Sequence, residues 1–131
     1  MRDEPTRHKG SATLLFCVDY RRVIDVARHL DHEYAVQGFR LFIAGVVDTC
    51  LAAQTAAIAA KALGIDSLFT NGVHRGDMGR VYRLLDFPRT YCFPAIALVL
   101  GYPETEPDHK RGWISGPGGI HRETYCHLSE E

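Results

Sequence analysis

Residues 41–64 read LFIAGVVDTCLAAQTAAIAAKALG, the most regular segment of the chain. Alanine, the best helix former, recurs through it, proline is absent, and Gly64 stands where a helix C-terminus is expected. The pattern predicts one long helix. Because apolar residues occupy most of its circumference, we expect a central helix that is buried on several sides. We also expect it to be too short for a membrane span, and too polar at Asp48, Gln54 and Lys61.

Two apolar, β-prone runs on either side of this helix predict buried strands. TLLFCVDY, residues 13–20, is uninterrupted, so we expect burial on both faces. FPAIALVLGYP, residues 93–103, is the second such run. A shorter β-prone stretch ends at the turn dipeptide Asn71-Gly72. Strands separated by long helical segments predict an α/β or α+β layered domain.

Two further helices are predicted. Residues 21–34 place apolar residues at helical spacing, and Gly38 interrupts the pattern. Residues 78–87 follow Asp77, a good N-cap residue, and are closed by Pro88. The residues that define these two apolar faces are Val23, Val26, Ala27, Leu30 and Tyr34 in the first and Val81, Leu84 and Leu85 in the second.

Length and composition bound the class of protein. With 131 residues, we expect one domain over residues 13–131 and a flexible N-terminal arm over residues 1–12. Lys and Arg number 15 against 16 Asp and Glu, so no overall field attracts nucleic acid or an anionic membrane. The first residues carry no apolar segment of signal-peptide type, which favours a cytoplasmic location. The scattered cysteines are then expected to be reduced, and Cys17, Cys50 and Cys92 to be buried.

Few residues suggest chemistry by themselves. Lys110 and Arg111 are adjacent cations in a loop after a strand, which suits phosphoryl oxygens but equally describes a solvated charge pair. Gly72 after Asn71 would let backbone N–H groups approach a flat ligand, or form an ordinary turn. The GPGG of residues 116–119 lacks the Lys-Ser/Thr of a phosphate-binding P-loop. The spacings of His121, Cys126 and His127 do not suit zinc, so no metal site is predicted, and no catalytic residue is identified.

Three segments read together resemble the C-terminal half of the nitroreductase family of FMN-dependent oxidoreductases. They are VVDTCLAAQTAAIAAKALGIDSLFTNG, FPAIALVLGYPETEP and HKRG. The resemblance covers roughly residues 13 to 127, and it also includes GPGGIH with the following Tyr125. The positions that carry it are Asp48, Gln54, Leu63-Gly64-Ile65, Gly72, Gly101-Tyr102-Pro103 and Lys110-Arg111.

The resemblance implies a fold, a cofactor and a site. The fold is an α+β three-layer α/β/α sandwich, and FMN binds at the interface of a homodimer. The family's flavin takes hydride from NADH or NADPH and passes electrons to nitroaromatics, quinones or similar small acceptors. Carried over to this chain, Arg111 with Lys110 contacts the FMN phosphate, and Thr70, Asn71 and Gly72 line the isoalloxazine edge.

The chain also departs from the family pattern. Family members are usually longer and open with an arginine-rich segment that grips the FMN phosphate, so the resemblance implies a fold truncated on its N-terminal side. Thr55 stands where the family often has Asn. Three interpretations follow. In the first, the chain is a flavin oxidoreductase that completes its pocket in a dimer or with a second chain. In the second, it is a truncated structural or interaction protein with weak or no flavin binding. In the third, it is a small α/β domain that binds another anion. We favour the first.

Overall fold

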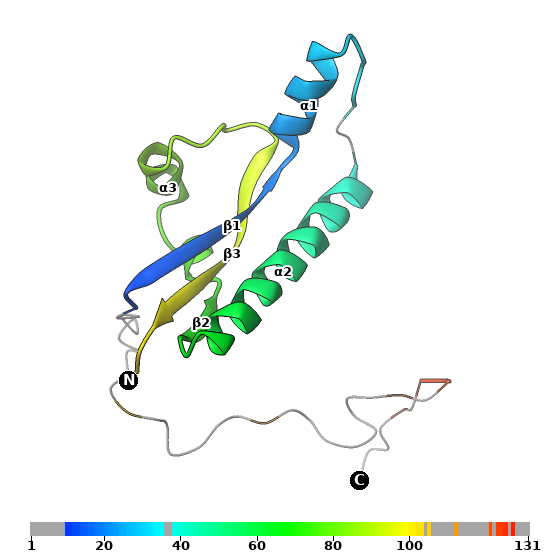
Figure 1. The fold of residues 1–131 in the computed structure, drawn as a ribbon. Coiled ribbons are helices and arrows are strands. Elements are labelled where there is room, and N and C mark those ends of the chain that lie inside the picture. Colours follow the sequence, from blue (N-terminus) through cyan, green and yellow to red (C-terminus); the bar gives the residue numbers. More distant parts are fainter. Residues whose placement is uncertain are drawn as a thin grey trace.

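The computed structural model describes residues 10–35, 38–103 and the separate residues 105, 112, 121, 123–125 and 127. Most of the predicted arm, residues 1–9, lies outside this description, as do Lys110, Arg111 and the GPGG segment. The elements follow in this order (Figure 1): β1 (Ala12–Asp19), α1 (Tyr20–His29), α2 (Phe39–Ala62), β2 (Asp66–Thr70), the 3₁₀ helix η1 (Gly72–Arg75), α3 (Met78–Leu84) and β3 (Cys92–Gly101).

The three strands form one antiparallel sheet in the order β1-β3-β2. Helix α2 packs along one side of this sheet and contacts all three strands, whereas α3 lies on the other side (Figure 1). Helix, sheet and helix therefore make the layered α+β arrangement that the sequence predicts.

Strand β3 is the centre of the core. Leu98 and Pro94 are fully buried and Ala97 nearly so, which confirms the predicted buried strand. Strand β1 differs from expectation: Val18 is its one buried residue, and Leu14 is 40% exposed. Burial on both faces was wrong for β1 because it forms an edge of the sheet and α2 covers one of its faces.

Small side chains on α2 face the sheet. The buried positions are Gly45, Thr49, Ala53 and Ala60, which fall on one stripe at 100° per residue. Gly45 marks the tightest approach, because a Cβ there would lie 2.6 Å from Val18 Cγ1. The alanine-rich sequence thus serves close helix–sheet packing as well as helix formation.

Most other positions of α2 are exposed, apart from the half-buried Leu41, Val46, Ala56 and Ala57. Leu51 is 63% and Ile58 62% exposed, so the expected burial on several sides was wrong: in the part of the chain that the structure describes, α2 packs on the sheet and its opposite face is exposed. The expectation about length was also wrong. At 24 residues α2 is long and apolar enough to cross a membrane by length and composition alone, with 11% of its most apolar window buried. Core helices of soluble proteins pass the same test, and α2 packs on a sheet.

The C-terminus of α2 is as predicted. Gly64 has φ +74°, its N–H donates to the Lys61 carbonyl at 3.0 Å, and the Ile65 N–H donates to the Ala60 carbonyl at 2.9 Å. This pair of bonds is a Schellman motif, which closes a helix with a left-handed residue.

Helix α1 is shorter than predicted. It ends at His29 instead of residue 34, because Asp31 adopts φ +56° and the His32 N–H donates back to the Ala27 carbonyl at 2.9 Å. Asp31 here takes the left-handed position that glycine usually fills, and Asp tolerates it better than most residues.

Helix α3 begins as predicted and ends early. The Asp77 carboxylate accepts from the Arg80 N–H at 3.1 Å, which confirms the N-cap. The helix ends at Leu84, before the expected stop at Pro88. Val81 is half-buried, whereas Leu84 is 79% and Leu85 47% exposed, so the described residues cover the predicted apolar face of α3 only in part.

Candidate functional site

A tight turn follows strand β2 and holds three of the predicted site residues together. Thr70 is half-buried at the end of the strand, and its Oγ1 accepts a hydrogen bond from the Gly72 N–H at 3.0 Å. Asn71 is exposed, and its carbonyl accepts from the His74 N–H at 3.0 Å. The turn leads directly into η1, so its backbone is fixed by short local bonds.

Gly72 leaves space beside Thr70 and does not adopt an unusual backbone angle. Positive φ occurs at Gly38 and Gly64 but not at Gly72. A Cβ at Gly72 would lie 3.1 Å from Thr70 Oγ1, closer than most Cβ contacts. A side chain at this position would therefore crowd the hydroxyl that holds the turn, and the glycine leaves the exposed side of the turn unobstructed.

His74 connects the turn to the central strand. Its Nε2 lies 3.1 Å from the carbonyl oxygen of Ala95 in β3. A carbonyl oxygen accepts and cannot donate, so Nε2 carries the hydrogen in this bond. Nothing in the sequence around His74 indicated this contact, because it joins positions 21 residues apart.

The predicted phosphate cations, Lys110 and Arg111, lie outside the described residues. The structure therefore brings Thr70, Asn71 and Gly72 together and leaves the placement of Lys110 and Arg111 a prediction. Strand β3, which precedes them in sequence, runs beside β2 with Thr70 opposite Ala97.

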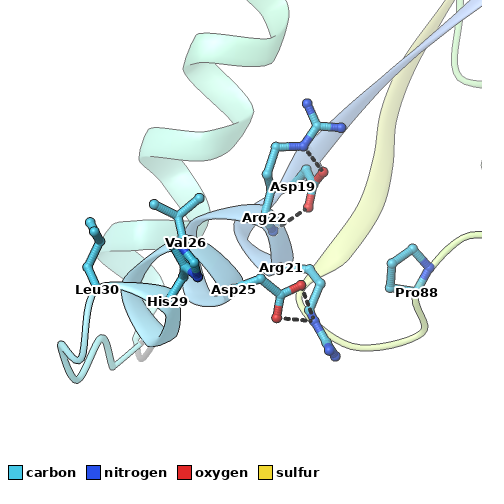
Figure 2. A pocket seen from close by; sticks show the side chains of 8 residues that line it. All are labelled: Asp19, Arg21, Arg22, Asp25, Val26, His29, Leu30 and Pro88. Atoms are coloured by element: carbon cyan, nitrogen blue, oxygen red, sulfur yellow. Dashed lines mark hydrogen bonds and ion pairs between the residues drawn. The ribbon is translucent and has the colours of Figure 1, made fainter.

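A groove of about 510 Å³ runs along α1, away from the predicted site (Figure 2). The sequence does not reveal it, because most of its lining is charged side chains at and just before α1, joined by Pro88 from a loop distant in sequence. The lining residues are Asp19, Arg21, Arg22, Asp25, Val26, His29, Leu30 and Pro88.

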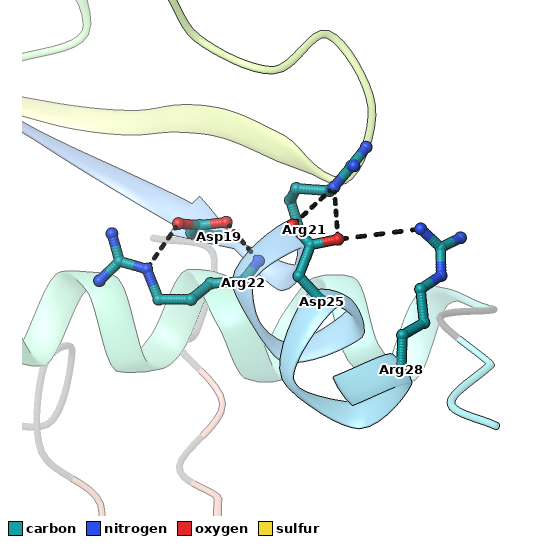
Figure 3. A network of polar contacts seen from close by, with 5 residues as sticks. All are labelled: Asp19, Arg21, Arg22, Asp25 and Arg28. Carbon is teal, nitrogen blue, oxygen red and sulfur yellow. Dashed lines mark hydrogen bonds and ion pairs between the residues drawn. The ribbon is translucent and has the colours of Figure 1, made fainter. Parts of the chain in front are cut away.

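The arginines of this groove are paired with the carboxylates of Asp25 in α1 and of Asp19, its N-cap residue (Figure 3). Arg21 Nε lies 3.0 Å from both carboxylate oxygens of Asp25, and Arg28 approaches the same carboxylate at 3.8 Å. Asp19 accepts from the Arg22 N–H at 3.1 Å, capping α1, and lies 3.6 Å from Arg22 Nε. Exposed pairs of this kind contribute roughly 0–1 kcal/mol each. The network therefore stabilises α1 locally and leaves little net charge for an anion.

The described cysteines do not supply a nucleophile in the core. Burial raises the pKa of Cys17 to about 11 and also raises the pKa of Cys92, so both thiols stay protonated near neutral pH. Cys50 is exposed, which corrects the expectation that it is buried. All three are free thiols. Among the described residues, no group of three His, Cys, Asp or Glu side chains is placed to hold a metal ion.

No family model matches the chain, but individual proteins do. The FMN reductase [NAD(P)H] of Bacillus subtilis (strain 168) is 30% identical over 130 residues, which cover 97% of this chain and 51% of that protein. The oxygen-insensitive NADPH nitroreductase of Salmonella typhimurium is 32% identical over 96 residues, 73% of this chain and 38% of that protein. Among solved structures, NfrA2 of B. megaterium superposes with a TM-score of 0.80 at 30% identity, covering 91% of this chain and 48% of that one.

The chain is a relative of the nitroreductase family. It spans about half the length of the relatives it matches, and that half is their C-terminal one. The predicted family resemblance and fold class are thereby confirmed. The Thr70–Gly72 turn lies at the end of β2.

Proposed function

We propose that this nitroreductase relative is an FMN-dependent oxidoreductase that passes electrons from NAD(P)H to a nitroaromatic, a quinone or a similar small acceptor. The observation that carries the proposal is the agreement in fold and sequence with proteins named FMN reductase [NAD(P)H] and oxygen-insensitive NADPH nitroreductase. When bound, FMN would supply the hydride and electron chemistry, so the protein's part is binding, orientation and electrostatics.

The turn after β2 suits one edge of a flavin. It presents an exposed backbone at Asn71, no side chain at Gly72, and a conformation fixed by Thr70 Oγ1. A flat ring can approach such a segment closely, because no Cβ intervenes. Lys110 and Arg111 are proposed to hold the phosphate, since adjacent cations form strong charge-assisted bonds to phosphoryl oxygens.

We propose that a second polypeptide, most simply a second copy of this chain, completes the pocket. A large part of α2 is exposed in the described part of the chain, and its exposed apolar residues lie opposite the stripe that packs on the sheet. At 100° per residue, Val47, Leu51 and Ile58 fall about 180° from the centre of the packed stripe. Exposed apolar faces of this extent are typical of surfaces that another chain covers.

The test is flavin titration of the natively purified chain. We expect FMN to stay with the protein through desalting, with its visible absorbance bands retained, and NADH or NADPH to bleach them. Arg111→Ala should weaken FMN binding by about 1.5–3 kcal/mol, because a hydrogen bond to a charged group is worth that much. Arg89→Ala, which removes an exposed arginine elsewhere, is the matched control and should leave the affinity unchanged.

Two results would contradict the proposal at different points. Unchanged FMN affinity in Arg111→Ala would remove the phosphate assignment and leave the flavin function standing. A wild-type chain that takes up no FMN, alone or at high concentration, would instead favour a nitroreductase-like interaction protein without cofactor, an alternative that the exposed face of α2 supports.

A further inference from the structure

The central strand of the sheet is irregular at one place, beside the Thr70–Gly72 turn. The pairing of β1 with β3 jumps from Phe16 opposite Ile96 to Cys17 opposite Pro94, so Ala95 has no partner residue on β1. A proline within a central strand explains the jump, because it has no N–H for the ladder and is tolerated mainly at bulges.

On the other side of β3 the pairing stops short of the same residue. The last pair between β2 and β3 is Thr70 opposite Ala97, and the chain then leaves the sheet for the turn. Ala95 lies two residues beyond this pair and therefore has no partner residue on β2 either. The His74 side chain fills this position, with its Nε2 3.1 Å from the Ala95 carbonyl oxygen.

His74 is thus a second anchor for the connection that follows β2. The first anchor is Thr70, whose hydroxyl accepts from the Gly72 N–H at 3.0 Å. The His74 N–H donates to the Asn71 carbonyl at 3.0 Å, so the ring that binds β3 belongs to the same hydrogen-bonded turn. A shift of the His74 ring would move the backbone of Asn71 and Gly72 relative to the sheet.

We propose that His74 is a positioning residue for the flavin-binding turn: it holds the Thr70–Gly72 backbone against β3 without touching the cofactor. This inference rests on the proposed function, which places the flavin edge at that turn. The ring must donate through Nε2, and both the cation and one neutral tautomer do so. A side-chain amide that reaches the same carbonyl should therefore substitute for it, whereas a ring of the same shape without a donor should not.

The experiment compares His74→Phe, His74→Gln and the control His32→Phe, an exposed histidine beyond the C-terminus of α1. The first readout is the dissociation constant for FMN. We expect it to rise about five- to tenfold in His74→Phe, since one neutral hydrogen bond is worth about 1 kcal/mol, and to stay within about twofold of wild type in His74→Gln and His32→Phe. Equal weakening by His74→Phe and His74→Gln, or no weakening by His74→Phe, would overturn the proposal.

The second readout is amide hydrogen exchange over residues 70–76 in the protein without flavin. Exchange should be faster in His74→Phe and restored in His74→Gln, because the turn is freed in one and held in the other. Unchanged exchange in His74→Phe would refute the anchoring role. If the wild-type chain takes up no FMN, the proposed function fails on that result alone, and the exchange data still decide whether His74 fixes the turn.

Discussion

At the scale of single residues, Gly45 decides how closely α2 approaches the sheet. A Cβ there would lie 2.6 Å from Val18 Cγ1 and 3.1 Å from the Tyr20 ring. The Tyr20 hydroxyl also donates to the Leu41 carbonyl at 2.6 Å, so the neighbouring ring is held in place and cannot easily move aside. Interiors packed at this density respond to an added methyl group with strain in the side chains or shifts of the backbone.

Gly45→Val should therefore lower the free energy of unfolding by about 2–3 kcal/mol, the cost of inserting atoms into a packed interface. Ala59→Val is the matched control, because Ala59 is exposed on the same helix and the new side chain is the same. It should cost under about 1 kcal/mol, through helix propensity alone. Urea unfolding followed by circular dichroism measures both. Equal losses in the two variants would show that Gly45 is not a packing contact.

At the scale of elements, chain reversals depend on left-handed residues placed after helices. Gly64 closes α2 with φ +74°, and the strand β2 begins two residues later. Asp31 performs the same function after α1 with φ +56°. These positions set the point at which each helix stops, and therefore where the following segment enters the sheet or the next helix.

Gly64→Ala should cost about 1–2 kcal/mol of stability, because a Cβ disfavours left-handed backbone by that amount. Gly76→Ala provides the contrast. Its φ is −101° and a Cβ there would meet nothing within 4 Å, so the substitution should be neutral or stabilise by up to about 1 kcal/mol through the unfolded chain. Thermal and urea unfolding of the two variants test the difference. A similar loss in both would mean that the closure of α2 at Gly64 does not limit stability.

The same elements show what sequence patterns predict here and what they do not. Local features were predicted correctly, because residue propensity and spacing determine them. They are the strand at residues 93–103, the long alanine-rich helix, its closure at Gly64 and the Asp77 cap of α3. Burial was predicted poorly. An apolar stripe such as Val23, Val26 and Leu30 shows that a face is to be covered, but not by which polypeptide.

The candidate site follows the same division. The turn at Asn71-Gly72 was recognisable from its residue types, and the family resemblance predicted that it contacts the flavin. The hydrogen bond from the His74 side chain to the Ala95 carbonyl could not be predicted, because it depends on a bulge at Pro94 and on the residue at which β2 ends. Contacts of this kind come from register, which one sequence specifies only through the whole sheet.

At the scale of the whole molecule, many large apolar side chains are exposed on the described part of the chain. Exposed large apolar residues occur on α1, α2 and α3. The longest row of them is the exposed face of α2 that contains Val47, Leu51 and Ile58. The relatives that share this fold are about twice as long, since the match covers 51% of one and 48% of another. A pairing of two chains along α2 would cover the largest of these surfaces, and it would supply the second polypeptide that we propose for the flavin pocket.

Leu51→Glu should break that pairing, because Leu51 is 63% exposed in the centre of the stripe and a carboxylate there would be buried without a partner. Leaving a buried charge unpaired costs about 3 kcal/mol or more, which raises the dissociation constant of a dimer roughly 100-fold. Sedimentation equilibrium should give the wild-type chain twice its 14.7 kDa mass and the variant a single one. Ala59→Glu introduces the same charge on α2, outside both the face packed on the sheet and the exposed apolar face. This variant should remain a dimer. A monomeric wild type would refute self-association and assign the α2 face to a different second chain. A Leu51→Glu variant that is still a dimer would show that the two chains meet through another surface.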